Sequence, residues 1–171
     1  MLSKTITSTL SLKNRHILNC ITINTDASFH PEEKVGGYAF YIVCDHFKIQ
    51  ISGAFKVPPL TIEEAEIMCI GNAIAVLLKQ EDLPTSRLIV INNDSLSAME
   101  KIRKSKTSLG GKVNSLLYQL RDRLQSKKPQ LRHVKAHSGI KDARSWVNEW
   151  CDTEAKKEMR KALQEKLILT T

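Results

Sequence analysis

Four acidic residues stand where predicted strands and helices can bring them together. Asp26 follows the run ITINT and Asp94 follows LIVINN, whereas Glu66 and Asp152 lie in helical stretches. Carboxylates that converge from rigid elements can hold two divalent cations about 4 Å apart. Without cations, the repulsion between them would be costly. The four acids therefore predict a site for Mg²⁺ or Mn²⁺, both of which favour oxygen ligands.

Taken one at a time, the same acids have ordinary structural roles. Asp94 can cap the helix that follows it, and Asp26 can form a turn. Glu66 can lie on a helix surface, and Asp152 can complement a helix dipole. Only their joint occurrence favours a metal site over these separate explanations.

The elements that position these acids follow from hydrophobic periodicity. We expect strands over residues 17–25, 37–43, 47–55, 87–91 and 131–134, a helix that opens at residue 61, and further helices over 95–104, 112–125 and 146–167. A break through Gly110 and Gly111 separates two of these helices. The order βββαβααβα predicts an α/β fold in which helices cover both faces of a mixed five-stranded sheet.

Two of the acids are expected at strand ends, where an open α/β sheet displays its functional groups. If their strands are parallel neighbours, Asp26 and Asp94 lie about 5 Å apart, which is one strand spacing. Glu66 stands at the edge of the apolar helix stripe that includes Ile67 and Ile70. We therefore expect its side chain to point back toward the sheet.

Length indicates the number of domains, and charge indicates the kind of partner. A chain of 171 residues fits one domain, with residues 1–16 as an N-terminal tail or extra strand and 17–171 as the folded domain. The net charge of +8 is uneven, because residues 101–135 hold eleven Lys/Arg and one acid. Such a basic band suggests a polyanionic partner, most commonly nucleic acid, and the alternative is a charged face kept for solubility.

The cysteines and the apolar runs exclude other classes. No CxxC pair is present among the four cysteines, which excludes zinc-ribbon and dithiol redox motifs. This cysteine usage suits a reducing compartment. No apolar run approaches the roughly 18 residues of a membrane span. We therefore expect a cytoplasmic protein with no membrane partner.

Six short segments resemble ribonuclease H of the type 1 class, in the order that this family has them. They are TDAS, GGYAFYIV, TIEEAEIM, NDS, HVKAHSG and NEWCDTEA, which together extend over about residues 21–157. The last two are the most specific. The resemblance implies an RNase H-like fold whose first three strands are antiparallel. It also implies an endonuclease that hydrolyses the RNA strand of an RNA/DNA hybrid.

The resemblance further implies roles for individual residues. Asp26, Glu66, Asp94 and Asp152 would hold two Mg²⁺ ions, or Mn²⁺ in their place, and His137 would assist proton transfer and product departure. A metal-activated water would attack the RNA phosphate while the second metal stabilises the leaving 3′ oxygen. The products would carry 5′-phosphate and 3′-hydroxyl ends. The enzyme is expected to act as a monomer.

Residues that would contact the hybrid are also implied by the resemblance. They are Ala27, Ser28, Thr61, Asn148, Lys101, Arg103, Lys104 and Lys112. Thr61 would bind a phosphate at the start of the first helix, and Asn148 would support the loop of His137. The four cations would meet phosphates electrostatically, although the basic helix that longer family members insert here is trimmed to a short linker.

Three positions depart from the pattern of that family. Ala27 replaces the usual glycine, and Ile62 and Leu96 replace the asparagine and glutamine that commonly read the minor groove. Because recognition of the 2′-hydroxyl distinguishes RNA from DNA, strict discrimination between the two strands stays open. No separate hybrid-binding module is expected ahead of the domain.

Two other functions remain as alternatives on the same fold. One is a DNA-directed nuclease of the resolvase or exonuclease type, but the exonuclease branch has D-x-E on its first strand and this chain has Asp26-Ala27-Ser28. The other is a non-catalytic nucleic-acid-binding module. Such modules usually lose one or more metal carboxylates, and this chain keeps all four, so hybrid cleavage is the favoured interpretation.

Overall fold

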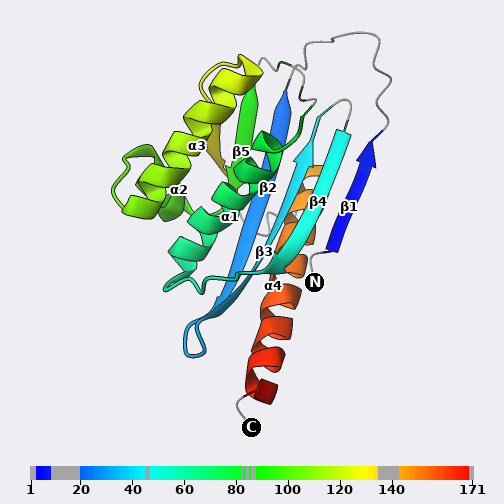
Figure 1. The fold of residues 1–171 in the computed structure, drawn as a ribbon, viewed down its shortest axis with the longest axis vertical. Helices are drawn as coiled ribbons and strands as arrows, with labels where there is room; N and C mark the ends of the chain where they lie inside the picture. The colour runs from blue at the N-terminus through cyan, green and yellow to red at the C-terminus, as the bar shows by residue number, and fades with distance from the viewer. Residues whose placement is uncertain are drawn as a thin grey trace.

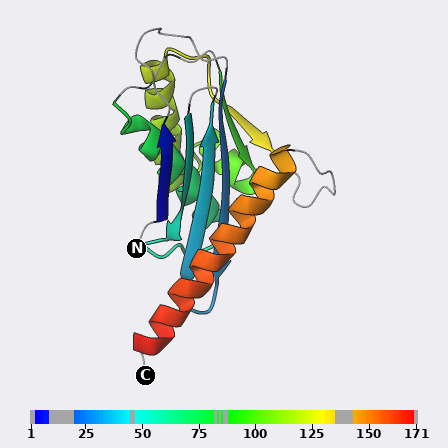
Figure 2. The ribbon, with the colours of Figure 1, turned by 90° about the vertical axis from the view of Figure 1, so that its right-hand side faces the viewer.

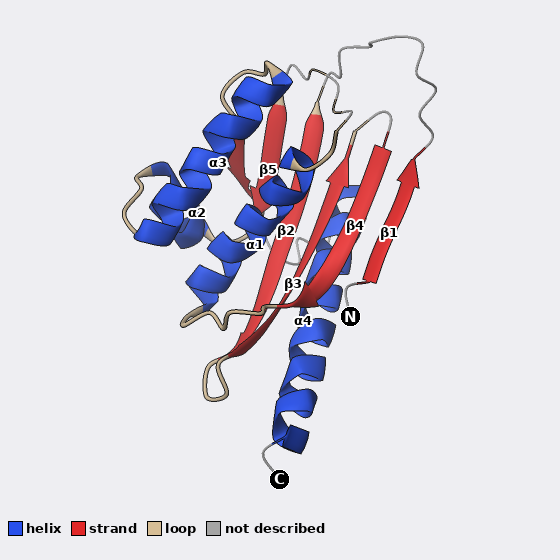
Figure 3. Cartoon of the chain, in the orientation of Figure 1, coloured by secondary structure: helices blue, strands red, loops and turns tan. Residues whose placement is uncertain are grey.

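The computed structural model describes residues 3–8, 20–44, 47–81, 83, 85, 88–134 and 143–169. Figures 1 and 3 show a twisted sheet with helices packed against it. The strands are β1 (Ser3–Ser8), β2 (Ile21–His30), β3 (Val35–Val43), β4 (Phe47–Ala54), β5 (Ile89–Asn93) and β6 (Gln130–His133). The helices are α1 (Ile62–Leu78), α2 (Leu96–Arg103), α3 (Ser108–Leu124) and α4 (Ala143–Leu169).

The expected mixed sheet is confirmed, and it is widened by one strand. β3 pairs antiparallel with both β2 and β4. β5 pairs parallel with β2, and β6 pairs parallel with β5. These five strands are the ones predicted, in the order β4-β3-β2-β5-β6. β1 adds to the free edge of β4 in antiparallel register, from Ser3 opposite Ser52 to Ser8 opposite Phe47.

Helices cover both faces of the sheet, as predicted. Figure 2 shows α4 crossing one face diagonally while the other helices lie on the opposite side. The larger core fills the space beneath α1, α2 and α3, where Phe40, Ile70 and Met99 are almost fully buried. A smaller core of Ala39, Tyr41, Cys151 and Ala155 lies between β3 and α4.

The predicted end of the first long strand is wrong. The sequence predicts a strand that stops just before Asp26, but β2 continues to His30. It continues because β2 and β3 form a hairpin whose pairing runs from Thr22 opposite Val43 to His30 opposite Val35. The polar segment 31–34 then makes the turn. Asp26 therefore sits in the middle of a strand and not at its end.

The predicted glycine break before α3 is also wrong. α3 begins at Ser108, and Gly110 and Gly111 lie inside its first turn. The Thr107 side chain caps the helix by accepting a hydrogen bond from the N–H of Gly110 at 3.0 Å. A Cβ at residue 110 would lie 2.6 Å from the carbonyl oxygen of Lys101. This glycine therefore permits close packing of α2 against α3 and does not end a helix.

Helix α1 starts where the sequence predicts. Thr61 is its N-cap and accepts a hydrogen bond from the N–H of Glu64 at 3.1 Å. The Glu64 carboxylate in turn accepts from the N–H of Leu60 at 2.9 Å, so the two side chains satisfy donors at the helix start. The helix that follows turns Glu66, Ile67 and Ile70 into the interior.

Helix α4 begins at Ala143, three residues before the predicted start, so Asp152 lies further inside the helix than expected. The helix packs closely on β3, because a Cβ at Gly37 would overlap the carbonyl oxygen of Ala155 and the amide nitrogen of Met159. The indole rings of Trp146 and Trp150 also meet the Tyr41 ring edge-on, with centroids 5.9 and 5.8 Å apart. None of the described helices is long and apolar enough to cross a membrane.

Candidate metal centre

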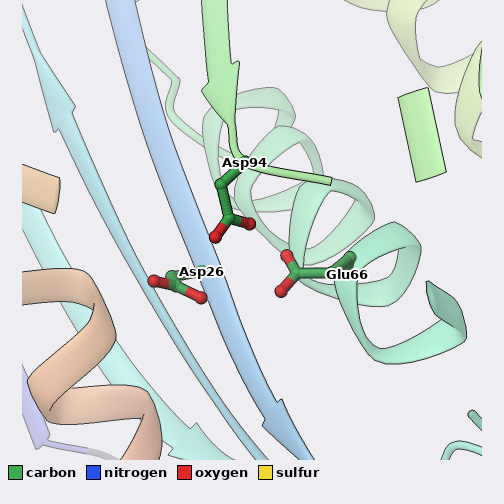
Figure 4. Close-up of side chains that lie close together, drawn as sticks. All are labelled: Asp26, Glu66 and Asp94. Atoms are coloured by element: carbon green, nitrogen blue, oxygen red, sulfur yellow. The ribbon is translucent and has the colours of Figure 1, made fainter. Parts of the chain in front are cut away.

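Three carboxylates converge beside the centre of the sheet. They are Asp26 on β2, Glu66 on α1 and Asp94 just after β5, and we refer to them as the triad. One carboxylate oxygen from each lies within 4.8 Å of the other two. Figure 4 shows the three side chains pointing toward a common space. Glu66 is buried, Asp26 is half-buried and Asp94 is exposed, so the space opens to solvent on one side.

Strand register brings the two aspartates together. The strands β2 and β5 are parallel neighbours, which meets the condition under which the sequence places the two aspartates one strand spacing apart, and Asn24 lies opposite Asn92. Two residues further along this register, Asp94 leaves the end of β5 beside Asp26. Glu66 reaches the same place from α1, because that helix packs against β2. Three separate segments thus supply one carboxylate each.

Burial and nearby negative charge raise the pKa of two triad members, Asp26 and Glu66. Burial, followed by the charges of Asp94 and Asp152, raises the pKa of Asp26 to about 8. Burial also raises the pKa of Glu66 well above its usual range, and the charge of Asp26 adds to this effect. A nearby cation would offset both causes, because it stabilises the ionised forms.

Glu66 is held at both of its oxygen atoms. The N–H of Ala27 donates to Oε1 at 3.1 Å, and the Asn93 side-chain amide donates to Oε2 at 2.7 Å. A carboxylate has about four lone-pair sites, so these two bonds leave acceptor capacity for a cation. The predicted inward direction of Glu66 is confirmed by its exposed fraction of only 3%.

Asn93 is a residue that the sequence interpretation missed. The sequence places it only in the polar end of a strand, whereas it is completely buried and contacts Glu66. The sequence does contain a signal that could have identified Asn93, because two consecutive asparagines follow the apolar run LIVI. Buried amides need hydrogen-bond partners, so a polar pair in a buried strand indicates partners on neighbouring elements.

Asp152 does not join the triad in this arrangement. Its side chain lies on α4, which covers the opposite face of the sheet from α1 (Figure 2), and pairs with Lys156 at 2.8 Å. It is nevertheless close enough for its charge to raise the pKa of Asp26. The structure thus brings three of the four predicted acids together and leaves the fourth near Asp26.

The donor set of the triad fits a divalent cation with a preference for oxygen. All three side chains offer carboxylate oxygens, and none of the triad members is a thiol or imidazole. Mg²⁺ and Mn²⁺ are the usual occupants of such sites, whereas zinc sites are rich in cysteine and histidine. The raised pKa of Asp26 indicates the same need for positive charge.

The structure describes four of the five other predicted site residues that are not Lys or Arg. His137 lies outside the described residues. Ala27 and Ser28 follow Asp26 on β2, and Asn148 is half-buried on α4. Thr61 is the N-cap of α1. The contacts of these residues with a substrate stay predictions.

The four predicted phosphate-binding cations lie on α2 and α3 or at their ends. Lys101 pairs with Glu63 of α1, and Lys104 pairs with Glu100. Arg103 donates to the carbonyl oxygen of Leu131. Lys112 is exposed on α3. The ion pair of Lys101 joins the N-terminal part of α1 to α2, so this cation also has a structural contact.

The sequence matches one known family over most of its length. The sequence model of the RNase H family matches residues 19–160. No curated protein sequence matches the chain significantly.

Three solved structures with a similar fold share 12–17% of their sequence with this chain. The N-terminal RNase H domain of Rv2228c from Mycobacterium tuberculosis, solved as a fusion with maltose-binding protein, has a TM-score of 0.61 at 17% identity, covering 86% of this chain and 99% of that one. RNase H1 from the halophilic archaeon Halobacterium salinarum NRC-1 has a TM-score of 0.57 at 12% identity, covering 84% and 99%. LC11-RNase H1 in complex with an RNA/DNA hybrid has a TM-score of 0.58 at 16% identity, covering 84% and 99%. Identities this low show similarity of fold.

Proposed function

This chain belongs to the RNase H family, and on that premise we propose that it is an endoribonuclease that hydrolyses the RNA strand of RNA/DNA hybrids. The observation that carries the proposal is the triad, whose three carboxylates come from β2, α1 and the end of β5. A family member that had become a pure binding module would have no need to keep this costly cluster.

We propose that Asp26, Glu66 and Asp94 hold divalent cations, with Asp152 as a further ligand. Two bound Mg²⁺ or Mn²⁺ ions would activate a water and neutralise charge on the phosphate and the leaving 3′ oxygen. The buried side of the triad, with Glu66 fixed at both oxygens, orients the ligands before substrate arrives. His137 is proposed to assist proton transfer, and the products would be 5′-phosphate and 3′-hydroxyl ends.

The proposed substrate is supported by charge and by one relative. The region 101–135 carries eleven Lys/Arg against one acid, which suits a nucleic-acid backbone. The fold neighbour LC11-RNase H1 was solved with an RNA/DNA hybrid. We propose that the hybrid lies across the open side of the triad, with Ala27, Ser28, Thr61 and Asn148 near the RNA and the cations of α2 and α3 near phosphates.

The cysteines bear on where in the cell the protein acts. We propose that the protein is cytoplasmic, because its four cysteines include no CxxC pair, as suits a reducing compartment. We also propose that it acts as a monomer.

The substrate class is tested by a panel of labelled nucleic acids. Purified protein is incubated with RNA/DNA, RNA/RNA, DNA/DNA and single strands, in Mg²⁺ and in Mn²⁺, with Asp94→Asn as the control. We expect cleavage of the RNA in the hybrid and loss of that cleavage in the variant. Equal cutting of a DNA duplex would instead support a DNA-directed nuclease. Binding of these substrates without cutting would support the non-catalytic alternative.

A further inference from the structure

Asn93 is the most completely buried polar side chain near the triad, and it touches more than one part of the site. It has an exposed fraction of 0% at the end of β5. Its side-chain nitrogen donates to Glu66 Oε2 at 2.7 Å and to Thr25 Oγ1 at 3.0 Å. Its side-chain oxygen accepts from the N–H of Ser95 at 2.8 Å. Every one of these partners lies within one residue of a triad member or is itself one.

The orientation of this amide is fixed by its partners. A backbone N–H can only donate, so the atom that faces Ser95 must be the oxygen. The nitrogen then faces Oε2 of Glu66, which accepts its hydrogen bond. The reversed orientation would place the oxygen against that carboxylate and leave the Ser95 donor without this acceptor. The contact with Glu66 is therefore a true donor contact to the carboxylate.

The same side chain also constrains Asp94. Its bond to the N–H of Ser95 spans residue 94, which is the pattern of an Asx turn. This turn ends β5 and sets the direction in which the backbone of Asp94 leaves the sheet. Ser95 then caps α2 by accepting from the N–H of Ala98 at 3.2 Å. One amide thus fixes Glu66 through its nitrogen and Asp94 through its oxygen.

We propose that Asn93 is a positioning residue of the metal centre, which holds Glu66 and Asp94 at the spacing that a cation requires. This inference rests on the proposed function, because it assumes that the triad binds divalent cations. Groups that hydrogen-bond to metal ligands typically account for about 10–100-fold in metal affinity or activity. A donor bonded to Glu66 and an acceptor that shapes the turn at Asp94 both fit that role.

The neighbouring asparagine provides a matched control. Asn92 is also buried, with an exposed fraction of 3%, and it precedes Asn93 on the same strand. Its side chain donates to the Asn24 side chain at 2.8 Å and not to a triad carboxylate. Alanine at either position removes one buried amide and its hydrogen bonds. A purely structural role of Asn93 would therefore give the two variants the same behaviour.

The test is the Mn²⁺ affinity of the full chain, measured by electron paramagnetic resonance, for wild type, Asn93→Ala and Asn92→Ala. We expect both variants to melt at a lower temperature. Only Asn93→Ala should bind Mn²⁺ more weakly, by on the order of tenfold. Its cleavage of a hybrid should recover as Mg²⁺ is raised, with an unchanged KM for the hybrid. Equal Mn²⁺ affinity in Asn93→Ala and wild type would overturn the inference.

A measurement on the wild type covers the case in which Asn93→Ala does not fold. In a nuclear magnetic resonance titration with Mg²⁺, the side-chain amide signals of Asn93 should shift more than those of Asn92. Signals of Asn93 that stay fixed at saturating Mg²⁺ would overturn the inference. Wild type that binds no metal would contradict both proposals. Metal binding weakened by Asn93→Ala, without any hybrid cleavage by wild type, would contradict only the proposed function.

Discussion

The ionisation of Asp26 links the geometry of the triad to its function. Burial and the charges of Asp94 and Asp152 raise its pKa to about 8, so near neutral pH the metal-free site keeps a proton on this group. A bound cation would take the place of that proton, because it neutralises the negative charge of the Asp26 carboxylate. Metal binding should therefore release protons and strengthen as pH rises.

The raised pKa of Asp26 should make the metal-free protein lose stability as pH rises. Below pH 3.8 the Asp26 carboxyl is protonated in both folded and unfolded states. Between pH 3.8 and about 8 only the unfolded state loses the proton, so the free energy of unfolding falls as pH rises, by up to about 1.4 kcal/mol per pH unit. We expect the melting temperature in chelator to fall across this window, and to fall less steeply in Asp26→Asn.

Mg²⁺ should reverse that trend in the wild type. Because the bound cation requires the ionised carboxylate, it should raise the melting temperature more at pH 8 than at pH 5. Identical pH profiles for wild type and Asp26→Asn in chelator would show that burial does not raise the pKa of this group.

Two exposed apolar residues stand where the resemblance to ribonuclease H implies polar side chains that read the minor groove. Ile62 and Leu96 lie in the first turns of α1 and α2 and have exposed fractions of 47% and 61%. Neither side chain can hydrogen-bond a 2′-hydroxyl. We predict that Ile62→Asn together with Leu96→Gln will raise the ratio of hybrid cleavage to DNA-duplex cleavage severalfold, since one added hydrogen bond contributes about 1 kcal/mol. An unchanged ratio in competition assays would place discrimination elsewhere.

At the scale of elements, local signals predict the structure well. The start of α1 at Thr61, its apolar stripe and the mixed sheet covered by helices are all predictable. Each depends on residues that are neighbours in sequence or on a general rule of sheet topology.

Long-range contacts explain what the sequence does not predict. β2 continues past Asp26 because β3 pairs with it up to Val35, and Gly110 lies inside α3 because α2 comes close to it. Asn93 is missed for the same reason, because its main partner, Glu66, is 27 residues away in the chain. Hydrophobic periodicity contains no information about these contacts.

The packing of α4 on β3 gives a prediction about stability. A Cβ at Gly37 would overlap backbone atoms of Ala155 and Met159, so α4 must shift to accept any side chain. We predict that Gly37→Ala lowers the free energy of unfolding by about 1–3 kcal/mol, measured by urea denaturation. The displaced α4 would also move Asp152 relative to Asp26.

Gly111→Ala is the matched control for this change. A Cβ at residue 111 would meet nothing closer than the Ser105 Cβ at 3.7 Å, and the residue lies inside α3. Alanine there should leave stability unchanged or raise it by up to about 1 kcal/mol. Equal effects of the two substitutions would contradict the close packing of α4 on Gly37.

Positive charge is distributed unevenly over the molecule. The excess of Lys and Arg over residues 101–134 lies on α2, α3, β6 and their connections, while the sequence outside 101–135 is close to neutral. α4, which includes Lys157, covers the opposite face of the sheet from α2 and α3 (Figure 2). A nucleic acid that follows the basic region from the triad would therefore contact one side of the protein.

This asymmetry predicts how binding depends on salt. Lys104→Ala together with Lys112→Ala should weaken hybrid binding across sequences and reduce the slope of log affinity against log salt by about 1 for each phosphate that is no longer neutralised. Lys157→Ala, which removes an exposed cation on α4, should leave the slope unchanged. Fluorescence anisotropy with a catalytically inactive variant would measure both. Equal slopes for all proteins would exclude α2 and α3 as the phosphate-binding surface.

The catalytic role of the triad is tested most directly by the single-turnover rate of RNA cleavage in an RNA/DNA hybrid with Mg²⁺, for wild type, Glu66→Gln and Glu63→Gln. The two glutamates lie on the same helix, but only Glu66 belongs to the triad, whereas Glu63 contacts Ser97 and Lys101. We predict cleavage to 5′-phosphate ends by wild type and Glu63→Gln, and a loss of at least about a hundredfold in Glu66→Gln, because several kcal/mol of metal-derived stabilisation is removed. Wild-type rates in Glu66→Gln would contradict the assignment of the triad as the catalytic metal centre.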